Sequence, residues 1–422
     1  MEINTPTIFN QSTLGNIFGN TLEWYDFVLY GSLAPFIAHH FFPEKNSLIS
    51  LMLTFAVFAV GFLMRPLGGM IFGYFGDTRG RRKPLLWSIA LMVIPTILIG
   101  FVPSYSTIGF LAPLIIILIR LFQGLAVGGE FAGSMVYLTE LSDQKNRAFF
   151  GSFASFGIFT GLLLGPIVIL LTNHSMTHNQ FSEWGWRVPF LFSFILGIIV
   201  YFWRRNMHES TAYIQDVKKK LITHSPIKEC FRSHKAALLI SACVSAQVGI
   251  PFWLVMVYSI TYFTKILHAP FSIVETQNMY AILISLIAIP FFGWLTKKIS
   301  TWLLLIIISF SFIVFSYVID IVLIHHVISE KFYMADFAIT ILVAAYLATF
   351  EGFLASLFPT EIRYSSIAIS YNISLAIFGG TAPLIVTAMI KNGIVTAPGI
   401  VLTIGGVIAF VALLFARRFA RY

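Results

Sequence analysis

The feature that most constrains this chain is its succession of apolar stretches, each long enough to form a membrane-spanning helix. A helix rises about 1.5 Å per residue and needs about 20 apolar residues to cross a hydrocarbon core about 30 Å thick. Twelve stretches reach that length, at roughly 12–40, 49–76, 84–103, 108–140, 148–172, 186–205, 236–264, 272–296, 301–325, 332–358, 364–390 and 397–416. Only 11% of the residues are charged, against about 25% in soluble domains. The sequence therefore predicts an all-α membrane protein with twelve transmembrane helices.

The distribution of cations predicts the orientation of these helices. With both termini cytoplasmic, the inner loops and tails hold 20 of the 27 Lys and Arg residues, and the outer loops hold five. Such an imbalance follows the positive-inside rule. It accounts for the net charge of +9 without a nucleic-acid partner.

Other function classes are disfavoured by what the sequence contains. Cys230 and Cys243 are the two cysteines, which predicts neither a disulfide framework nor a thiolate metal site. The first apolar stretch contains Glu23 and Asp26, so we expect no cleaved signal peptide. We identify no Walker-type glycine loop and no metal-ligand cluster, so we expect neither an enzyme nor a primary pump, and no cofactor.

The longest polar segment, Arg204 to Lys235, divides the stretches into two sets of six. We predict an N-terminal six-helix bundle at 1–205, a basic cytoplasmic linker at 206–235 with a surface helix, and a C-terminal six-helix bundle at 236–422.

Two matches between the halves predict a parallel internal repeat. Glu130 precedes Glu140 by ten residues, and the pair recurs at Glu351 and Glu361, an offset of 221. Gly73 is matched by Gly293 at an offset of 220. The basic turn that follows Gly73 is only partly repeated after Gly293, because Lys297 stands where the first half has Asp77. We therefore expect asymmetric closing interactions between the bundles.

Four motifs resemble a known family. The stretch Gly73-x3-Asp77-x-Arg79-Gly80-Arg81-Arg82 resembles the loop signature of the major facilitator superfamily. Three segments resemble its metabolite:proton symporter branch: Gly19 to Phe27, Arg65-Pro66-Leu67-Gly68-Gly69, and Arg120-x2-Gln123-Gly124-x3-Gly128-Gly129-Glu130. The helix count, the central loop and the Phe-Pro-Thr-Glu-Ile-Arg segment at 358–363 extend the resemblance over the whole chain.

The resemblance implies two pseudo-symmetric six-helix bundles in a bacterial inner membrane. It implies proton-coupled uptake of a small carboxylate-bearing metabolite, either an organic acid or a zwitterion of the proline and betaine kind, with the proton as coupling ion and no obligate protein partner. It also implies a cytoplasmic latch of Asp77, Arg81 and Glu140. The chain ends six residues past the last stretch, so we expect no coiled-coil tail of the kind found on osmosensing relatives.

Two alternatives remain open. Gly157, Gly161, Gly165 and Pro166 are similar to a motif of drug:proton antiporters, although small residues at four-residue spacing also allow close helix packing. An exporter of amphiphiles is therefore one alternative, and uptake of a metal-chelating polycarboxylate is a variant of the main interpretation.

Ionisable residues within the helices are the main candidates for function, because a charge in the bilayer costs several kcal/mol unless it has a partner or a proton. Six such residues lie deep within the predicted helices: Glu23, Asp26, Arg65, Arg120, Glu130 and Glu351. The four acids are candidates for proton coupling. Arg65, roughly 18 Å from the cytoplasmic Asp77 along its helix, is expected to form an intramembrane ion pair with Glu23 or Asp26. An architectural role is the alternative for Glu130 and Glu351.

Arg120 is the predicted ligand of a substrate carboxylate, since its planar guanidinium binds carboxylates in bidentate fashion. A structural ion pair is the alternative. Residues at helical spacing on the first helix and aromatic or amide residues elsewhere complete the predicted binding site: Asn20, Tyr30, Gln123, Trp253, Tyr371 and Asn372.

Overall fold

The computed structural model describes residues 10–44 and 46–417, and within these ranges all regular structure is helical. The first half contains α1 (Gln11–Ser32), α2 (Ala34–Phe41), α3 (Ser47–Arg79), α4 (Arg82–Phe101), α5 (Tyr105–Ile108), α6 (Leu111–Leu141), α7 (Arg147–Gly151), α8 (Phe153–His174), α9 (His178–Glu183), the short 3-10 helix η1 (Gly185–Arg187) and α10 (Val188–Arg205). Two short helices follow, α11 (Thr211–Lys218) and α12 (Pro226–Ser233). Residues 1–9, Lys45 and residues 418–422, on which part of the charge and signal-peptide argument depends, lie outside the described residues.

The second half has the same kind of organisation. It contains α13 (Lys235–Pro251), the π-helix η2 (Phe252–Tyr258), α14 (Ser259–Thr261), the π-helix η3 (Tyr262–Ile266), α15 (Phe271–Leu295), α16 (Thr301–His325), α17 (Glu330–Leu357), the 3-10 helix η4 (Thr360–Ile362), α18 (Arg363–Ser374), the π-helix η5 (Leu375–Gly379), α19 (Ala382–Lys391) and α20 (Ala397–Ala416). The predicted span 236–264 is therefore helical throughout and contains π-helical turns, whereas the predicted span 364–390 contains a π-helical turn followed by a break in the helix at Gly380 and Thr381. Turns of this kind often mark functional sites.

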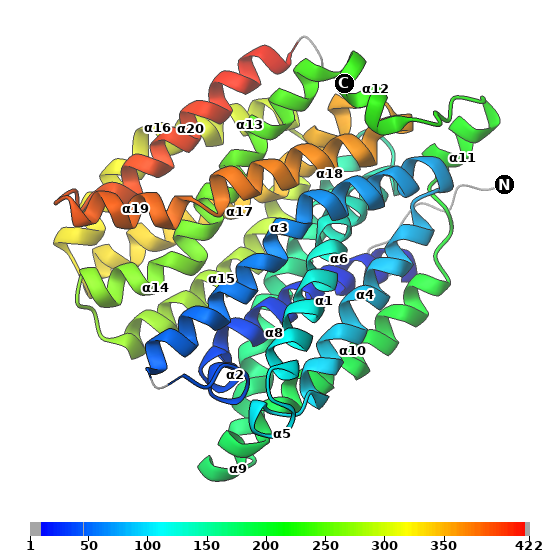
Figure 1. The fold of residues 1–422 in the computed structure, drawn as a ribbon. Helices are drawn as coiled ribbons and strands as arrows, with labels where there is room; N and C mark the ends of the chain where they lie inside the picture. Colours follow the sequence, from blue (N-terminus) through cyan, green and yellow to red (C-terminus); the bar gives the residue numbers. More distant parts are fainter. Residues whose placement is uncertain (1–9, 45, 418–422) are drawn as a thin grey trace.

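The long helices run side by side, with α11 and α12 at one end of the molecule and α2, α5 and α9 at the other (Figure 1). We call the end with α11, α12 and the turn at residues 79–83 the basic end. Eleven helical segments in the described ranges are long and apolar enough to cross a membrane. Helix α1, at 22 residues, is the twelfth, and its lower hydropathy comes from buried polar side chains such as Asn16, Asn20, Glu23 and Asp26. The predicted twelve-helix fold is confirmed.

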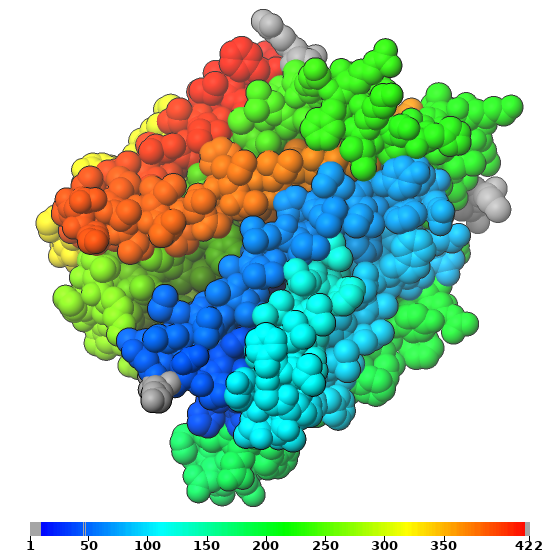
Figure 2. All heavy atoms as spheres, viewed as in Figure 1, coloured from blue at the N-terminus to red at the C-terminus, as the bar shows by residue number. Residues whose placement is uncertain are grey.

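The two halves of the chain form separate bundles that lie against each other (Figure 2). In the first bundle α1 packs on α8 and α10, and α6 packs on α3 and α4. In the second bundle α13 packs on α18 and α20, α16 packs on α17 and α20, and α15 packs on α17. The bundles meet through α3 with α18, α6 with α18, α8 with α15, and α7 with α17.

The glycines of α8 explain its tight packing on α1. A Cβ atom on Gly157 would clash with the carbonyl oxygen of Ile17, and one on Gly161 would clash with that of Thr21. Small residues at this spacing let the two backbones approach closely. The close-packing interpretation of this motif is therefore confirmed.

Candidate functional site

The centre of the first bundle contains a buried ion pair between Asp26 on α1 and Arg120 on α6. Arg120 Nη1 lies 2.8 Å from Asp26 Oδ2, and the two residues are 3% and 1% exposed. Asp26 Oδ1 accepts hydrogen bonds from Thr96 Oγ1 on α4 at 2.8 Å and from Gln123 Nε2 at 2.9 Å. Three helices thus fix the carboxylate in one position, with both of its oxygens hydrogen-bonded.

Arg120 retains unused donors in this arrangement. Its Nε and Nη2 atoms are buried and have no hydrogen-bond partner within the described ranges. These atoms form one edge of the guanidinium, the kind of edge that binds a carboxylate through two parallel hydrogen bonds. The guanidinium also lies 3.7 Å from the ring centroid of Tyr30, whose hydroxyl donates to Thr54 O, so the aromatic face stabilises the cation.

An aromatic chain connects this pair to the second bundle. Tyr30 stacks on Phe58 with 5.5 Å between ring centroids, Phe58 contacts Phe62 at 5.2 Å, and Phe62 contacts Trp253 on η2 at 5.7 Å. Of the predicted substrate-binding residues, Tyr30, Arg120 and Gln123 therefore surround Asp26, and Trp253 lies at the other end of the chain of rings.

The remaining predicted binding residues make other contacts. Asn20 donates to Ser134 Oγ at 2.8 Å within the first bundle, while its Oδ1 has no partner among the described residues. Tyr371 packs against Phe131 across the bundle interface, with 5.0 Å between ring centroids. Asn372 donates to Gly128 O across the same interface at 2.7 Å. Tyr371 and Asn372 therefore hold the bundles together in this arrangement.

Glu23 is the least satisfied acid of the first bundle. It is fully buried, and neither of its carboxylate oxygens has a hydrogen-bond partner in the part of the chain that the structure describes. The neighbouring Trp24 contacts Phe252 of the second bundle at 4.8 Å between ring centroids, so Glu23 lies close to the bundle interface. A buried carboxylate without partners is stable only if it gains a proton or a cationic ligand.

The predicted intramembrane ion pair of Arg65 is wrong for this structure. Arg65 Nε donates to Asn372 Oδ1 at 3.3 Å and its guanidinium lies 5.4 Å from the Phe62 ring, and no ion pair of Arg65 occurs among the described residues. The reason is that Asp26 faces α6 and takes its cation from Arg120 instead. Arg65 joins the two bundles rather than α3 and α1.

Glu130 forms an ion pair with Arg204, one of the cations that the positive-inside rule predicts at the cytoplasmic surface. Arg204, in the last turn of α10, is fully buried and contacts both carboxylate oxygens of Glu130, with Nη1 at 2.9 Å from Oε2. Ser88 Oγ donates to the same Oε2 at 2.5 Å, and Arg204 also donates to the carbonyl of Gly15. This contact joins α1, α4, α6 and α10, which favours the architectural alternative for Glu130.

Glu351, the repeat partner of Glu130, has no cation within ion-pair distance among the described residues. Its Oε1 accepts hydrogen bonds from the backbone N of Ser155 at 3.1 Å and from Ser155 Oγ at 2.5 Å, while Oε2 has no partner there. Ser155 lies in the first turn of α8, where backbone N–H groups are free and the helix dipole favours an anion. Glu351 of the second bundle thus caps a helix of the first.

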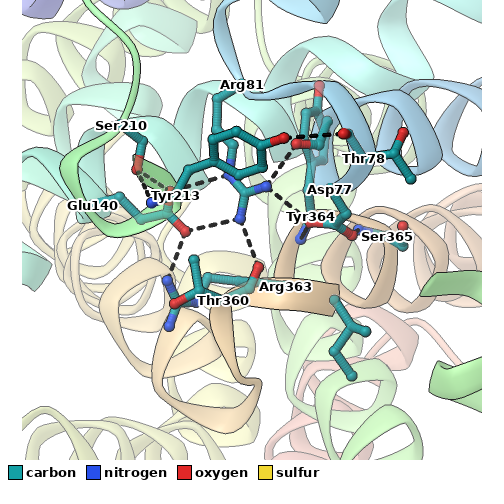
Figure 3. A network of polar contacts seen from close by, with 12 residues as sticks. Asp77, Thr78, Arg81, Glu140, Ser210, Tyr213, Thr360, Arg363, Tyr364 and Ser365 are labelled. Atoms are coloured by element: carbon teal, nitrogen blue, oxygen red, sulfur yellow. Dashed lines mark hydrogen bonds and ion pairs between the residues drawn. The ribbon is translucent and has the colours of Figure 1, made fainter. Parts of the chain in front are cut away.

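At the basic end, Asp77, Arg81, Glu140 and Arg363 form a buried network that we call the latch (Figure 3). Arg81 Nη1 lies 3.1 Å from Asp77 Oδ1, and its Nε and Nη2 each lie 3.1 Å from an oxygen of Glu140. Arg363 Nη1 of the second bundle lies 2.6 Å from Glu140 Oε1. The three predicted latch residues are therefore in direct contact. Arg363 was not predicted as a latch residue, because a single arginine in an inner loop is also what the positive-inside rule predicts.

The latch also binds backbone groups across the interface. Asp77 accepts from the backbone N of Tyr364 at 3.1 Å and of Ser365 at 2.8 Å, in the first turn of α18, and Arg81 Nη2 donates to Thr360 O at 2.7 Å. The close approach depends on Gly73, since a Cβ atom there would lie 2.6 Å from Ser365 Cα. These contacts close the basic end between the bundles.

The partly repeated turn of the second half does not make this contact. Lys297, at the position of Asp77, lies over the Phe149 ring at 3.9 Å, and a Cβ atom on Gly293 would clash with Ser152. Gly293 therefore marks a close approach of α15 to the start of α8, as Gly73 does for α3 and α18. The acid that caps the opposing helix comes instead from Glu351 on α17.

The fold and these contacts define a membrane transporter. The chain belongs to the sugar (and other) transporter family of the major facilitator superfamily, and the family model matches residues 13–225. It is a secondary transporter of small metabolites and not an enzyme. The resemblance of the four sequence motifs to the major facilitator superfamily is confirmed.

Relatives of known name cover nearly the whole chain. A putative proline/betaine transporter of Staphylococcus aureus is 35% identical over 405 residues, covering 94% of this chain and 86% of the relative. The alpha-ketoglutarate permease of Escherichia coli is 30% identical over 409 residues, covering 96% and 93%. The proline/betaine transporter of Salmonella typhimurium is 33% identical over 383 residues, covering 87% and 75%.

Solved structures share the fold. A proton:xylose symporter bound to 6-bromo-6-deoxy-D-glucose superposes with a TM-score of 0.80 at 18% identity, covering 97% of this chain and 95% of that one. A bacterial homologue of the iron transporter ferroportin, in an outward-facing state, gives a TM-score of 0.66 at 15% identity, covering 95% and 98%.

Proposed function

We propose that this protein is a proton-coupled symporter that takes up a small carboxylate-bearing metabolite by alternating access between its two bundles. The names of the relatives support this substrate class, because proline, betaine and alpha-ketoglutarate all carry a carboxylate. The basic end is cytoplasmic by the positive-inside rule, with both termini on that side of a bacterial inner membrane.

The observation that carries the proposal is the unpaired Nε and Nη2 edge of Arg120 beside Asp26. A substrate carboxylate binds this edge, and it competes with Asp26 for the same positive charge. A proton on Asp26 removes that competition, because a neutral carboxyl group no longer attracts the guanidinium as an anion does. Proton and substrate binding therefore favour each other, which is the coupling that a symporter requires.

The zwitterionic variant of this substrate class uses the neighbouring groups. The aromatic faces of Phe58 and Phe62 and the unpartnered carboxylate of Glu23 suit an ammonium group at the other end of the substrate. Glu23 is thus the second proton-coupling candidate. Glu351 is the third, while Glu130 acts through its contact with Arg204 as a structural residue.

The latch supplies the alternating-access step. Its contacts hold the basic end closed, so substrate reaches the site from the opposite end in this arrangement. Opening the basic end separates Asp77 from α18 and Glu140 from Arg363, and substrate and proton then leave to the cytoplasm.

Uptake into right-side-out membrane vesicles tests the proposal. We expect radiolabelled proline, glycine betaine or alpha-ketoglutarate to accumulate when an inward proton gradient is imposed and not when a protonophore is present. Extrusion of dyes driven by the gradient, without uptake of any of these substrates, would refute symport and favour the exporter. Uptake of citrate that requires a divalent metal would identify the polycarboxylate variant.

The Asp26→Asn variant tests the coupling residue. Asparagine has nearly the same shape as aspartate but carries no charge, so we expect gradient-driven accumulation to be lost while substrate exchange without a gradient continues. Asp143→Asn, at an exposed position near the basic end, is the matched control and should accumulate substrate normally. Thermal unfolding of both purified variants checks the fold, and full accumulation by a folded Asp26→Asn protein would remove Asp26 from the mechanism.

A further inference from the structure

The second bundle has a groove on its lateral surface between α15 and α17. Residues of α15 from Ser272 to Ile287 line one side, and Tyr333 and Phe337 of α17 line the other. Its volume is about 730 Å³, within the range of about 300–1,000 Å³ that is usual for small-molecule sites. Because α15 and α17 both have the length and hydropathy of membrane spans, the groove faces lipid rather than water.

The two ends of the groove differ in polarity. Both helices begin at the end away from the latch, and there the lining has the hydroxyl and amide groups of Ser272, Gln277 and Tyr333. Toward the middle of α15 the lining is apolar, with Leu283 39% and Ile287 75% exposed. A ligand that suits both ends has a polar head and an apolar tail.

The length of the groove matches one leaflet of a bilayer. From Ser272 to Ile287 the helix α15 rises roughly 22 Å, at about 1.5 Å per residue. Half of a bilayer about 40–45 Å thick, headgroups included, has the same depth. An extended phospholipid therefore fits along the groove with its headgroup at the polar end.

Gln277 indicates which headgroup fits. It is 2% exposed, and its Nε2 donates to Asp336 Oδ2 at 2.8 Å. An ionised carboxylate only accepts hydrogen bonds, so this contact fixes the amide with its Nε2 toward Asp336. The remaining Oε1 atom is buried and has no donor among the described residues. Buried acceptors are rarely left without a partner, so this end of the groove lacks one donor.

The surrounding charge favours a cationic donor. Asp336 is 4% exposed and forms no ion pair within the described ranges, and an uncompensated negative charge in a membrane span is costly. None of the described residues that line the groove is basic, so the lining does not select an anionic headgroup. A primary ammonium group supplies both a hydrogen bond to Gln277 Oε1 and a positive charge near Asp336. A trimethylammonium group has no N–H to donate.

We propose that the groove binds one molecule of phosphatidylethanolamine in the leaflet away from the latch. Its ammonium group donates to Gln277 Oε1, the hydroxyl groups of Ser272 and Tyr333 donate to its phosphate, and one acyl chain lies along Leu283 and Ile287. The lipid joins α15 to α17 and stabilises the second bundle at that end. This inference does not rest on proton coupling or on the identity of the transported substrate.

Lipid retention by the purified full chain tests the site. The protein is delipidated in detergent and incubated with phosphatidylethanolamine, phosphatidylcholine or phosphatidylglycerol of the same acyl chains, and bound lipid is counted by native mass spectrometry. We expect one phosphatidylethanolamine per chain to be retained at concentrations at which the other two lipids are lost. The same lipid should raise Tm saturably, since a ligand that binds only the folded state stabilises it by mass action.

Two variants and a matched control locate the lipid. Leu283→Trp fills the apolar part of the groove and keeps every polar group, so it should abolish retention. Leu303→Trp on α16, a position with a similar exposure of 42%, should retain the lipid. Gln277→Leu removes the acceptor and should weaken phosphatidylethanolamine binding by about tenfold, as loss of one hydrogen bond to a charged group does, so that phosphatidylcholine binds equally well.

Three results would overturn the proposal. Equal retention of the three lipids would indicate only non-specific boundary lipid, and preference for phosphatidylglycerol would contradict the ammonium site. Equal retention of phosphatidylethanolamine by Leu283→Trp and Leu303→Trp would place the lipid elsewhere. The groove would instead be an interface between copies of this chain if the unsubstituted protein were a dimer in nanodiscs and Leu283→Trp made it monomeric, which would also overturn the proposal.

Discussion

Replacing Asp77 with asparagine should open the basic end of the molecule. Asp77 accepts two backbone hydrogen bonds from α18 across the interface, at 3.1 Å from Tyr364 N and 2.8 Å from Ser365 N. Its contact with Arg81 lies within the first bundle and survives in either state, so only the two inter-bundle bonds count toward the equilibrium. Hydrogen bonds to a charged acceptor contribute about 1.5–3 kcal/mol each. Asparagine keeps one acceptor oxygen, so one bond is lost and the other becomes a weaker neutral bond, a combined cost of about 3 kcal/mol.

A loss of that size shifts the ratio of closed to open molecules roughly a hundredfold, since about 1.4 kcal/mol corresponds to a factor of ten. The shift can be measured by double electron–electron resonance spectroscopy, which gives the distance between nitroxide labels attached at Lys83→Cys and Lys298→Cys. Both positions are exposed at the basic end, and they belong to different bundles. Cys230 and Cys243 are replaced by alanine in this background. Asp77→Asn should add a long-distance population that the unsubstituted protein lacks.

The control for this measurement is Asp143→Asn, because Asp143 is exposed near the same end and makes no contact with α18 among the described residues. Its distance distribution should match that of the unsubstituted protein. If Asp77→Asn also matches, the latch contacts do not determine the closed state and the energetic argument fails.

Two further predictions concern stability. Glu130→Gln and Arg204→Gln should each destabilise the protein by about 3–5 kcal/mol, because each leaves one buried charge unpaired. The double variant should recover part of that loss in thermal unfolding, and strictly additive losses would contradict a direct pair. Asp216, outside the membrane-spanning segments, lines a polar cavity of about 330 Å³ beside Glu361 and Arg363, and its pKa is raised by burial and then by the nearby Glu361 and Glu140 carboxylates. A raised pKa means that the folded state binds this proton more tightly than the unfolded chain does, so the stability it contributes is present at low pH and is lost as pH rises through the folded pKa. Asp216→Asn should therefore raise Tm at neutral pH but not at acidic pH, and equal shifts at both would show that the charge is not responsible.

The sequence predicts the twelve helices well because the bilayer imposes length and hydropathy on every span. Even α1, which carries several buried polar residues in its middle, is recognisable from the apolar residues around them. Asp77 and Arg81 are four residues apart, so the end of α3 brings them together. Glu140 lies 59 residues from Arg81, and only the family resemblance implied its place in the latch.

Pairings between helices are less predictable, because they depend on how each helix is rotated about its axis. Arg65 and Arg120 are both arginines on helices near α1, and only the folded packing shows that Asp26 faces Arg120. Arg204 has the sequence character of a cation flanking a membrane span, and its side chain instead turns back toward Glu130, 74 residues earlier in the chain. Asp336 lies near a helix end, where sequence alone does not distinguish a buried acid from one at the membrane surface.

The reciprocal capping of α18 by Asp77 and of α8 by Glu351 has a consequence for how the bundles separate. Each bundle contributes one acid and receives one at a helix N-terminus, so the two capping contacts of the interface at the basic end lie at two points and involve different pairs of helices. A tilt that breaks one point can leave the other intact as a pivot. The order in which the two points part therefore sets the direction of the tilt, and substitutions at Asp77 and at Glu351 should produce openings of different shape rather than the same opening at different populations.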